Sequence, residues 1–358
     1  MVQGQSIRAA ALIGAGGSCF AGIPTVMSFF ERVIWPESQG HQAACQELAR
    51  RISISEKSEE SLAWPKFDAE KLFGWLEILE RTAQVHDPRM GIHIPNPPIP
   101  IPVAEVIAHI RQEIVRIYGV PLQADILSKA PHRALIEVLD KAHPADEPLG
   151  VFTTNYDPIL EQLFEEWSAL PSGRTLHACD GFSKGRPGRW KPDLFLARPA
   201  RGERLIQLMK LHGSATWKMD ATGPIETGWG MPTPHDCLLY FGYKSVPEAE
   251  PFITLHTRLK AALVECDAIV VVGFRLADPY IRELFDFALR ANARLRVICC
   301  LTRQPDSNSP ISVMMMQFPG RIQVLADQAG NCIPFGHADF PAVLEETLIG
   351  RRHADAVA

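Results

Sequence analysis

The sequence lacks the features of a membrane, secreted or zinc-ribbon protein. No stretch of its 358 residues approaches the roughly 20 consecutive apolar residues that a membrane helix needs. Its start has neither the basic segment nor the cleavage site of a secretion signal. The eight cysteines are scattered, and no two of them form a C-x-x-C pair, which argues against structural zinc. We therefore expect a cytoplasmic protein that holds no zinc.

An excess of positive charge is also missing. The formal net charge is -5 and the pI is about 6.2, which disfavours binding to nucleic acid or to an anionic membrane across the whole surface. The basic pair Arg351-Arg352 is too short to form a patch. With 46% hydrophobic and 22% charged residues, the composition is that of an ordinary globular protein. The length allows one large domain or two.

Short apolar runs predict the strands of a parallel sheet. Such runs lack polar alternation, which is typical of strands that are buried on both faces. Helical periodicity between and after them predicts helices at 252–265, Pro279–Asn292 and 339–349. This alternation predicts an α/β fold with a doubly wound parallel sheet. The predicted strands are 7–13, 149–153, 205–211, 268–273, 295–301 and 321–326.

A mostly helical insertion is predicted between the first two strands, over residues 26–145. A period of about 3.6 residues is clear at 103–117 and weaker at 66–85. Between them, Pro95–Pro102 can be neither a helix nor a central strand. The predicted domains are a core of residues 1–25 and 146–335, the insertion, and a C-terminal helix and tail at 336–358.

Two later stretches interrupt the strands, at 170–203 and 215–250. Both are rich in glycine, proline and charge, so we expect surface loops near the carboxyl edge of the sheet.

Polar motifs close two of the predicted strands. Thr153–Asp157 follows the run at 149–152, and Leu211–Ser214 follows the run at 205–209. Since open α/β sheets bind ligands at the carboxyl ends of their strands, an amide, a carboxylate and an imidazole in one crevice predict a reaction centre. Two alternatives stay open: His212 as a core histidine satisfied by backbone, and Asp157 as the N-cap of a helix that starts at Pro158.

A Gly-rich turn, Gly14–Ser18, follows the first predicted strand. Glycines let the backbone approach a pyrophosphate, and the N-terminus of a following helix supplies N–H donors. However, Cys19 replaces the third glycine of the dinucleotide fingerprint, and no acidic residue ends a second strand about 20 residues further on. Nucleotide binding and a tight turn without a ligand both stay open, whereas a dehydrogenase is disfavoured.

Four motifs in this order resemble those of the sirtuin superfamily. They are Gly14–Ser18 with Gly22-Ile23-Pro24, then Thr154–Asp157, Leu211–Ser214 and Val272–Pro279. The resemblance implies a Rossmann-like domain that binds NAD and breaks its nicotinamide–ribose bond.

The resemblance also implies roles for single residues. Asn155 would contact the nicotinamide ribose, His212 would act as general base, and Asp157 would orient the loop or the ribose. These residue types suit the reaction, because an amide can donate and accept at once and an imidazole titrates near neutral pH. The implied NAD contacts are Gly14, Ala15, Gly16 and Ser18 at the phosphates, Ile23 and Pro24 at the nicotinamide, Gly273 and Asp278 near the adenosine ribose, and Thr154 and Ser214.

Two departures distinguish the chain from lysine-deacylating sirtuins. The interval where those enzymes carry a four-cysteine zinc module holds only Cys237 and Cys266. After Gly-Ile-Pro, where they carry Asp-Phe-Arg, this chain has Thr25-Val26-Met27. It resembles instead the prokaryotic sirtuin-like effectors that hydrolyse NAD in antiviral defence, and among these the partners of HerA-type ATPases.

This resemblance implies an NAD glycohydrolase (an NAD+ hydrolase) that uses NAD as substrate, is controlled by a partner and assembles into a homo-oligomer. A protein deacylase or ADP-ribosyltransferase is one alternative, and a non-catalytic subunit that binds NAD or ADP-ribose is another. We expect no metal site, because no carboxylate cluster has the metal-binding pattern. The histidines His177, His235, His256 and His337 are expected in loops or on exposed helix faces.

Overall fold

The computed structural model describes most of the chain outside the insertion. The described residues are 6–25, 29, 43–45, 47–48, 51, 72, 74–76, 78–80, 82, 91–95, 98–185, 187–228, 237–239, 247 and 249–349. The first residues of the predicted helical insertion, 26–28, and most of the stretch with the weaker helical period, 66–85, lie outside them. Within the described part, no helix is long and apolar enough to cross a bilayer.

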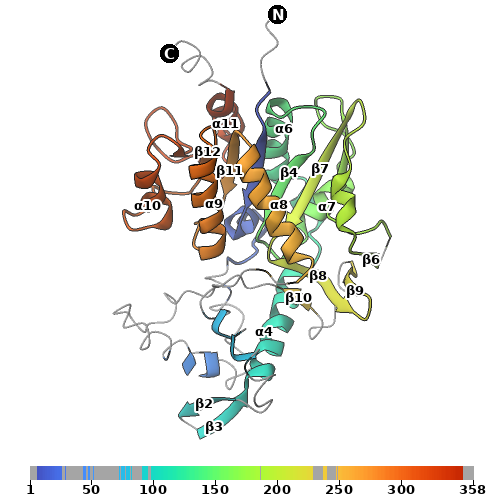
Figure 1. The fold of residues 1–358 in the computed structure, drawn as a ribbon, viewed down its shortest axis with the longest axis vertical. Coiled ribbons are helices and arrows are strands. Elements are labelled where there is room, and N and C mark those ends of the chain that lie inside the picture. The colour runs from blue at the N-terminus through green and yellow to red at the C-terminus, as the bar shows by residue number, and fades with distance from the viewer. Residues whose placement is uncertain are drawn as a thin grey trace, which may run out of the picture.

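A seven-stranded sheet forms the centre of the protein (Figure 1). All neighbouring strands in it run parallel. The chain leaves β1 toward β4 and later returns to the other side of β1 with β11, so the sheet is doubly wound, as predicted. The order is β13 (Ile322–Val324), β12 (Arg296–Cys300), β11 (Ala268–Val272), β1 (Ala9–Ile13), β4 (Leu149–Thr153), β7 (Glu203–Lys210) and β5 (Thr175–Cys179).

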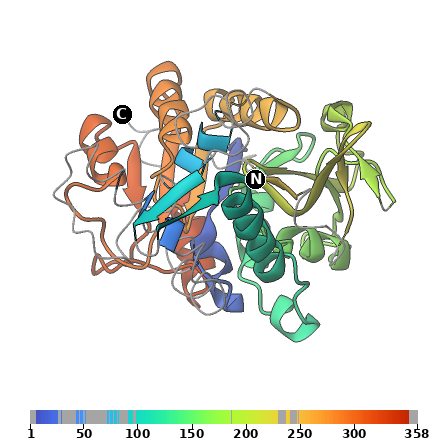
Figure 2. The ribbon, with the colours of Figure 1, turned by 90° about the horizontal axis from the view of Figure 1, so that it is seen from below.

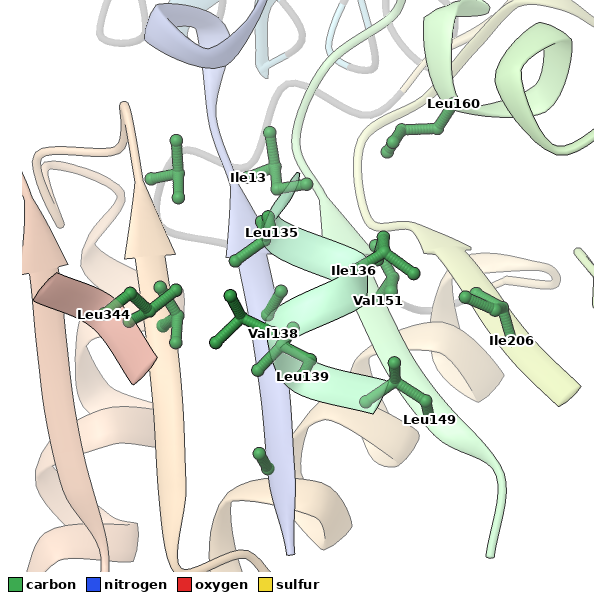
Figure 3. Close-up of a cluster of buried hydrophobic side chains, with 14 of the residues drawn as sticks. Ile13, Leu135, Ile136, Val138, Leu139, Leu149, Val151, Leu160, Ile206 and Leu344 are labelled. Carbon is green, nitrogen blue, oxygen red and sulfur yellow. The ribbon is translucent and has the colours of Figure 1, made fainter. Parts of the chain in front are cut away.

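Helices cover both faces of this sheet. Successive residues of a strand point to opposite faces, and in β1 the side chains of Ala9, Ala11 and Ile13 enter one core cluster whereas Ala10 and Leu12 enter the other. Figure 3 shows the first cluster, where helix residues such as Leu135 and Leu139 lie against the strands. Its helices are α5 (Ala124–Leu127), α6 (His132–Ala142), α7 (Ile159–Glu166) and α11 (Phe340–Ile349); α8 (Phe252–Glu265), α9 (Pro279–Ala291) and α10 (Pro310–Gln317) cover the other face.

Within the insertion, the described residues between 91 and 118 lie at the carboxyl edge of the sheet (Figures 1 and 2), whereas α5 and α6 pack on one face of it. Helix α4 (Val103–Tyr118) follows a two-stranded antiparallel hairpin of β2 (Gly91–Pro95) and β3 (Pro98–Pro102). The proline-rich segment is thus neither helix nor central strand, as predicted, because both strands of such a hairpin are edges. The buried stripe of α4 shares a third core cluster with Tyr156 and Ala215, which follow β4 and β7.

The prediction of surface loops at 170–203 and 215–250 is wrong in large part. The first stretch supplies β5, β6 (Gly188–Arg189) and the short helix η2 (Pro192–Leu196). The second supplies most of a four-stranded antiparallel sheet in the order β10-β8-β9-β6. The strands other than β8 are short, and β8 buries glycine, serine and threonine, so no apolar alternation marks this sheet. The further strands are β8 (Gly213–Asp220), β9 (Gly223–Glu226) and β10 (Cys237–Leu239).

Candidate active site

Strand register brings the predicted motifs to one edge of the sheet. Thr153 pairs with Lys210, so Asn155 and His212 each lie two residues beyond the same level. Ile13 pairs with Thr153 on one side and with Val272 on the other. The four motifs therefore meet at the carboxyl end of β1, between β4 on one side and β11 on the other. Doubly wound sheets bind ligands at such a switch point.

The side-chain amide of Asn155 makes a hydrogen bond through its nitrogen but not through its oxygen. Nδ2 donates to Oγ of Ser18 at 2.8 Å, and the backbone N–H of Asn155 donates to Oγ1 of Thr153 at 3.0 Å. The residue is 8% exposed, and Oδ1 has no hydrogen-bond partner among the described residues. An unsatisfied buried acceptor is unfavourable, so this oxygen is suited to accept from a ligand or a water.

Asp157 is not the N-cap that the sequence left open, because α7 begins at Ile159 and its N-cap is Pro158. Its Oδ2 accepts from Oγ of Ser18 at 2.8 Å, which extends the chain of contacts from Asn155. Its Oδ1 accepts from the backbone N–H of Ile159 at 3.2 Å, at the start of α7. Burial raises the pKa of this carboxyl, and Lys210 and Ser18 oppose that shift.

Lys210 is a site residue that the sequence reasoning missed. Its Nζ donates to the backbone oxygen of Asp157 at 2.5 Å and to Oε1 of Glu161 at 2.6 Å. Lys210 is 1% and Glu161 7% exposed, and burial raises the pKa of the Glu161 carboxyl against the effect of the lysine. A lysine that ends an apolar strand directly before the Leu-His-Gly-Ser motif was the available signal.

His212 contacts a carboxylate from another strand end. Its Nε2 lies 3.1 Å from Oδ2 of Asp278, and the two residues are 5% and 2% exposed. The second oxygen of Asp278 accepts from the N–H of Ile281 at 3.0 Å and so caps α9. The resemblance had placed Asp278 near the adenosine ribose, whereas the structure places it against the predicted base.

His256 is buried, so the prediction of an exposed position is wrong for this histidine. It projects from α8, and its Nε2 donates to the backbone oxygen of Leu211 at 2.9 Å. Burial, assisted by the charge of His212, lowers the pKa of His256 to about 4, so the ring is neutral at pH 7. It supports the peptide unit that precedes His212.

The Gly-rich turn packs directly against the loop after β11. Gly14 donates to the oxygen of Val272 at 2.8 Å, and Gly16 donates to the oxygen of Gly273 at 3.0 Å. A Cβ on Gly16 would stand 2.7 Å from the Cα of Gly273. These glycines are therefore required by the approach of two backbones, whatever ligand the turn holds. Residues Ala15–Ala21 form the 3₁₀ helix η1 immediately after the strand.

The insertion supplies one wall of the site. The hydroxyl of Tyr118, at the end of α4, donates to the backbone oxygen of Pro24 at 3.0 Å. Its ring contacts that of Tyr156 edge-on, with centroids 6.0 Å apart. Ser214 is fully buried and bonds to the backbone oxygen of Tyr156 and to Thr216. These contacts bring the Gly-Ile-Pro segment, the Asn155 loop and the His212 loop together.

The described residues hold no metal cluster, and a cavity lies apart from Asn155 and His212. Among the residues that the structure describes, no group of three or more His, Cys, Asp or Glu side chains could hold a metal ion. A cavity of about 300 Å³ lies between the sheet and α8, lined by Phe152, Phe195, Met209 and Arg258 among others. Its lining includes neither Asn155 nor His212.

Fold and site together define an α/β protein with a cluster of buried polar residues at the switch point of a parallel sheet. Residues 150–313 match the family model of the SIR2-like domain, a range that contains Asn155, His212 and Asp278. This match supports the resemblance to the sirtuin superfamily.

Solved structures of Sir2 proteins are also similar over nearly the whole chain. A Sir2 homologue mutant in complex with 2'-O-acetyl ADP ribose shares 14% identity at a TM-score of 0.40, over 97% of this chain and 92% of that one. A Sir2 homologue in complex with NAD shares 15% at a TM-score of 0.39, over 98% and 90%. A structure on the mechanism and regulation of Sir2 enzymes shares 15% at a TM-score of 0.40, over 97% and 94%. No curated protein sequence matches.

Proposed function

We propose that this protein is an NAD glycohydrolase that cleaves NAD to nicotinamide and ADP-ribose. The observation that carries the proposal is the buried Oδ1 of Asn155, which has no partner among the described residues although Ser18 fixes its amide. It lies at the same level of the sheet edge as His212. An acceptor and a base at one strand edge suit a hydroxyl or a water that must be oriented and deprotonated.

The residues of the site fit NAD in a defined way. NAD supplies a glycosidic carbon that becomes electron-poor as nicotinamide leaves with the bonding electron pair. Asn155 accepts a hydrogen bond from a ribose hydroxyl or from the attacking water, and His212 takes the proton as the water oxygen bonds to that carbon. Asp157 and Ser18 hold Asn155 in place.

The remaining contacts with NAD are proposals from the resemblance. Hydrogen bonds within the protein limit which groups are free to make these contacts. The N–H groups of Gly14 and Gly16 already donate to the end of β11 and to the loop after it. We therefore propose that Ala15 is the residue of this turn that donates to a phosphate. The hydroxyl of Ser18 serves Asn155 and Asp157, so Ser18 would reach a phosphate only through its backbone. Ile23 and Pro24 would face the nicotinamide, and Thr154, Ser214 and Gly273 would line the remaining surface.

Water is proposed as the second substrate because the sequence lacks the parts that bind an acylated lysine. The interval from His212 to β11 holds only Cys237 and Cys266, and no Asp-Phe-Arg follows Gly-Ile-Pro. This chain therefore lacks the zinc module and the Asp-Phe-Arg segment that the lysine-deacylating sirtuins carry.

Nicotinamide release tests the proposal. Purified protein, alone and with its genomic partner, is incubated with NAD, and the products are separated by chromatography. Asn155→Ala and His212→Ala should each lower release by about 100-fold or more. Asp286→Asn, on the exposed surface of α9, is the matched control and should release as much as wild type.

Two outcomes would contradict hydrolysis, and a third would contradict the proposed site. No nicotinamide under any condition, with NAD binding intact by calorimetry, would indicate a non-catalytic binding subunit. Turnover that requires an acylated peptide or an acceptor protein would indicate a deacylase or an ADP-ribosyltransferase. Equal release by wild type and both site variants would place the reaction elsewhere.

We further propose a defence role in which a partner releases the activity. The resemblance to effectors that work with HerA-type ATPases supports this context, as does the expected homo-oligomer. Size-exclusion chromatography with light scattering tests the oligomer. Co-purification with the product of a neighbouring ATPase gene tests the partner; a stable monomer that captures no such ATPase would contradict this part of the proposal.

A further inference from the structure

The pair of His212 and Asp278 is the contact in the site that the resemblance does not explain. We infer that Asp278 is a positioning residue, which fixes the orientation and the tautomer of His212. This inference rests on the proposed function, in which His212 is the base.

Asp278 is itself held firmly. One carboxylate oxygen lies 3.1 Å from Nε2 of His212, and the other accepts from the N–H of Ile281 at 3.0 Å. The preceding loop contains Leu276 at φ 54°, the one positive-φ residue other than glycine in the described part of the chain. A leucine in this region is strained, and Arg282 donates to its backbone oxygen at 3.1 Å. The strained loop turns Asp278 toward the crevice.

The main chain before His212 is fixed on two sides. The N–H of Leu211 donates to the backbone oxygen of Thr153 at 2.8 Å, and its own oxygen accepts from Nε2 of His256 at 2.9 Å. The imidazole of His212 is thus anchored through its backbone at one end and through Asp278 at the other. A catalytic base needs this kind of support, since small errors in its position lower the rate steeply.

The carboxylate also decides which ring nitrogen carries the proton. A carboxylate only accepts hydrogen bonds, so Nε2 of His212 carries the hydrogen and Nδ1 carries the lone pair. Nδ1 is then the nitrogen that takes a proton from a hydroxyl or a water. Once His212 is protonated, the adjacent carboxylate of Asp278 stabilises the imidazolium without taking the proton itself, as in other His–Asp pairs.

The same geometry argues against a contact between Asp278 and the adenosine ribose. Both carboxylate oxygens already have partners inside the protein, and the residue is 2% exposed. A ribose hydroxyl would have to displace His212 or the helix cap.

Asp278→Asn is the informative variant. Asparagine caps a helix about as well as aspartate, so α9 keeps its N-cap while His212 loses the charge that fixes its tautomer. We expect kcat to fall by about 100-fold or more while the KM for NAD and the unfolding midpoint stay close to wild type. In a His212→Ala background, Asp278→Asn should change kcat by less than about twofold, because Asp278 acts only through His212.

A measurement without turnover tests the same inference. In protein labelled with ¹⁵N in its histidines, NMR should report Nε2–H as the tautomer of His212 in wild type and in the Asp286→Asn control. In Asp278→Asn the ring should shift toward the other tautomer or toward a mixture. If Asp278→Asn does not fold, Asp278→Ser replaces it, since serine also caps.

The outcomes separate this inference from the proposed function. If wild type releases no nicotinamide, the proposed function fails, and the NMR result alone decides whether Asp278 sets the tautomer. If wild type is active and Asp278→Asn keeps full kcat, or raises only KM, the positioning role is overturned and the proposed function stands. A tautomer that is unchanged in Asp278→Asn overturns it as well.

Discussion

The hydroxyl of Ser18 lies between Asn155 and Asp157 and bonds to both. It accepts from Nδ2 of Asn155 at 2.8 Å and donates to Oδ2 of Asp157 at 2.8 Å, across 137 and 139 residues of sequence. A single hydroxyl therefore joins the Gly-rich turn to the end of β4. Because Ser18 occupies the amide nitrogen, the oxygen of Asn155 is the atom of this amide that is left without a partner among the described residues.

Ser18→Ala should reduce catalysis more than binding. Loss of the hydroxyl releases the amide of Asn155 and leaves the buried Asp157 with one partner fewer, which lowers the free energy of unfolding by about 1–3 kcal/mol. We expect kcat for nicotinamide release to fall by at least about tenfold, from steady-state kinetics with NAD. Ser128→Ala, at an exposed hydroxyl, is the control. Wild-type kcat in Ser18→Ala would show that Asn155 holds its position without Ser18.

Lys210→Met should be among the most destabilising changes near the site. It leaves Glu161 as an uncompensated buried charge and frees the backbone oxygen of Asp157. The expected loss is about 3–5 kcal/mol of unfolding free energy, measured by urea denaturation, and the double variant Lys210→Met/Glu161→Leu should recover most of it.

An exposed ion pair provides the control for that prediction. Lys141 lies 2.7 Å from Glu345, with side chains 54% and 37% exposed. Lys141→Met should lower stability by less than about 1 kcal/mol. If both lysine variants lose the same stability, the buried pair is no more important than the exposed one.

Gly273→Ala tests the close packing of two backbones at the crevice. Gly273 has φ +60°, and a Cβ there would stand 2.4 Å from the nitrogen of Gly17. Gly320→Ala is the matched control, because Gly320 has φ +73° and nothing within 4 Å of its Cβ position. In both variants, alanine in the left-handed region lowers the free energy of unfolding by about 1–2 kcal/mol. Only Gly273→Ala must also move the Gly-rich turn, so it should lose clearly more thermal stability; equal losses would argue against this packing.

The strand framework was predictable because burial on both faces leaves a strong signal. The runs at 149–152 and 268–272 are apolar throughout, and parallel strands end at the same edge, so the polar residues that follow them had to gather there. The second sheet was missed for the opposite reason. Strand β8 buries serine and threonine beside Trp217, and such a strand has no apolar period to detect.

Side-chain pairs were the part of the site that the sequence could not reveal. Periodicity predicts which face of an element is buried, but it does not identify the partner that a buried polar group meets. Lys210 with Glu161 and His212 with Asp278 join groups 49 and 66 residues apart. His256 is a similar case. A histidine on an amphipathic helix predicts an exposed side chain, but His256 is buried beside Leu255 because it bonds to the backbone oxygen of Leu211.

His132 should make stability depend on pH below neutrality. The ring is 1% exposed between Phe20 and Phe335, and burial lowers the pKa of His132 to about 3. The folded state therefore keeps the ring neutral while the unfolded chain takes up a proton below about pH 6.5. Its contribution is complete above that pH and is lost as the pH falls toward 3, by up to about 1.4 kcal/mol per pH unit.

His132→Phe removes this titration and keeps an aromatic ring. Relative to wild type, the variant should gain stability progressively as the pH falls from 6.5 to about 4, by about 1.4 kcal/mol per unit at most. Urea unfolding at pH 7.5, 5.5 and 4.5 measures the difference, in which carboxyl groups common to both proteins cancel. Phe340→Leu, one ring further from His132, should instead differ from wild type by the same amount at each pH. If the difference between His132→Phe and wild type is the same at every pH, the prediction is wrong. Such a result would mean that the His132 ring takes up its proton equally in the folded and unfolded chains.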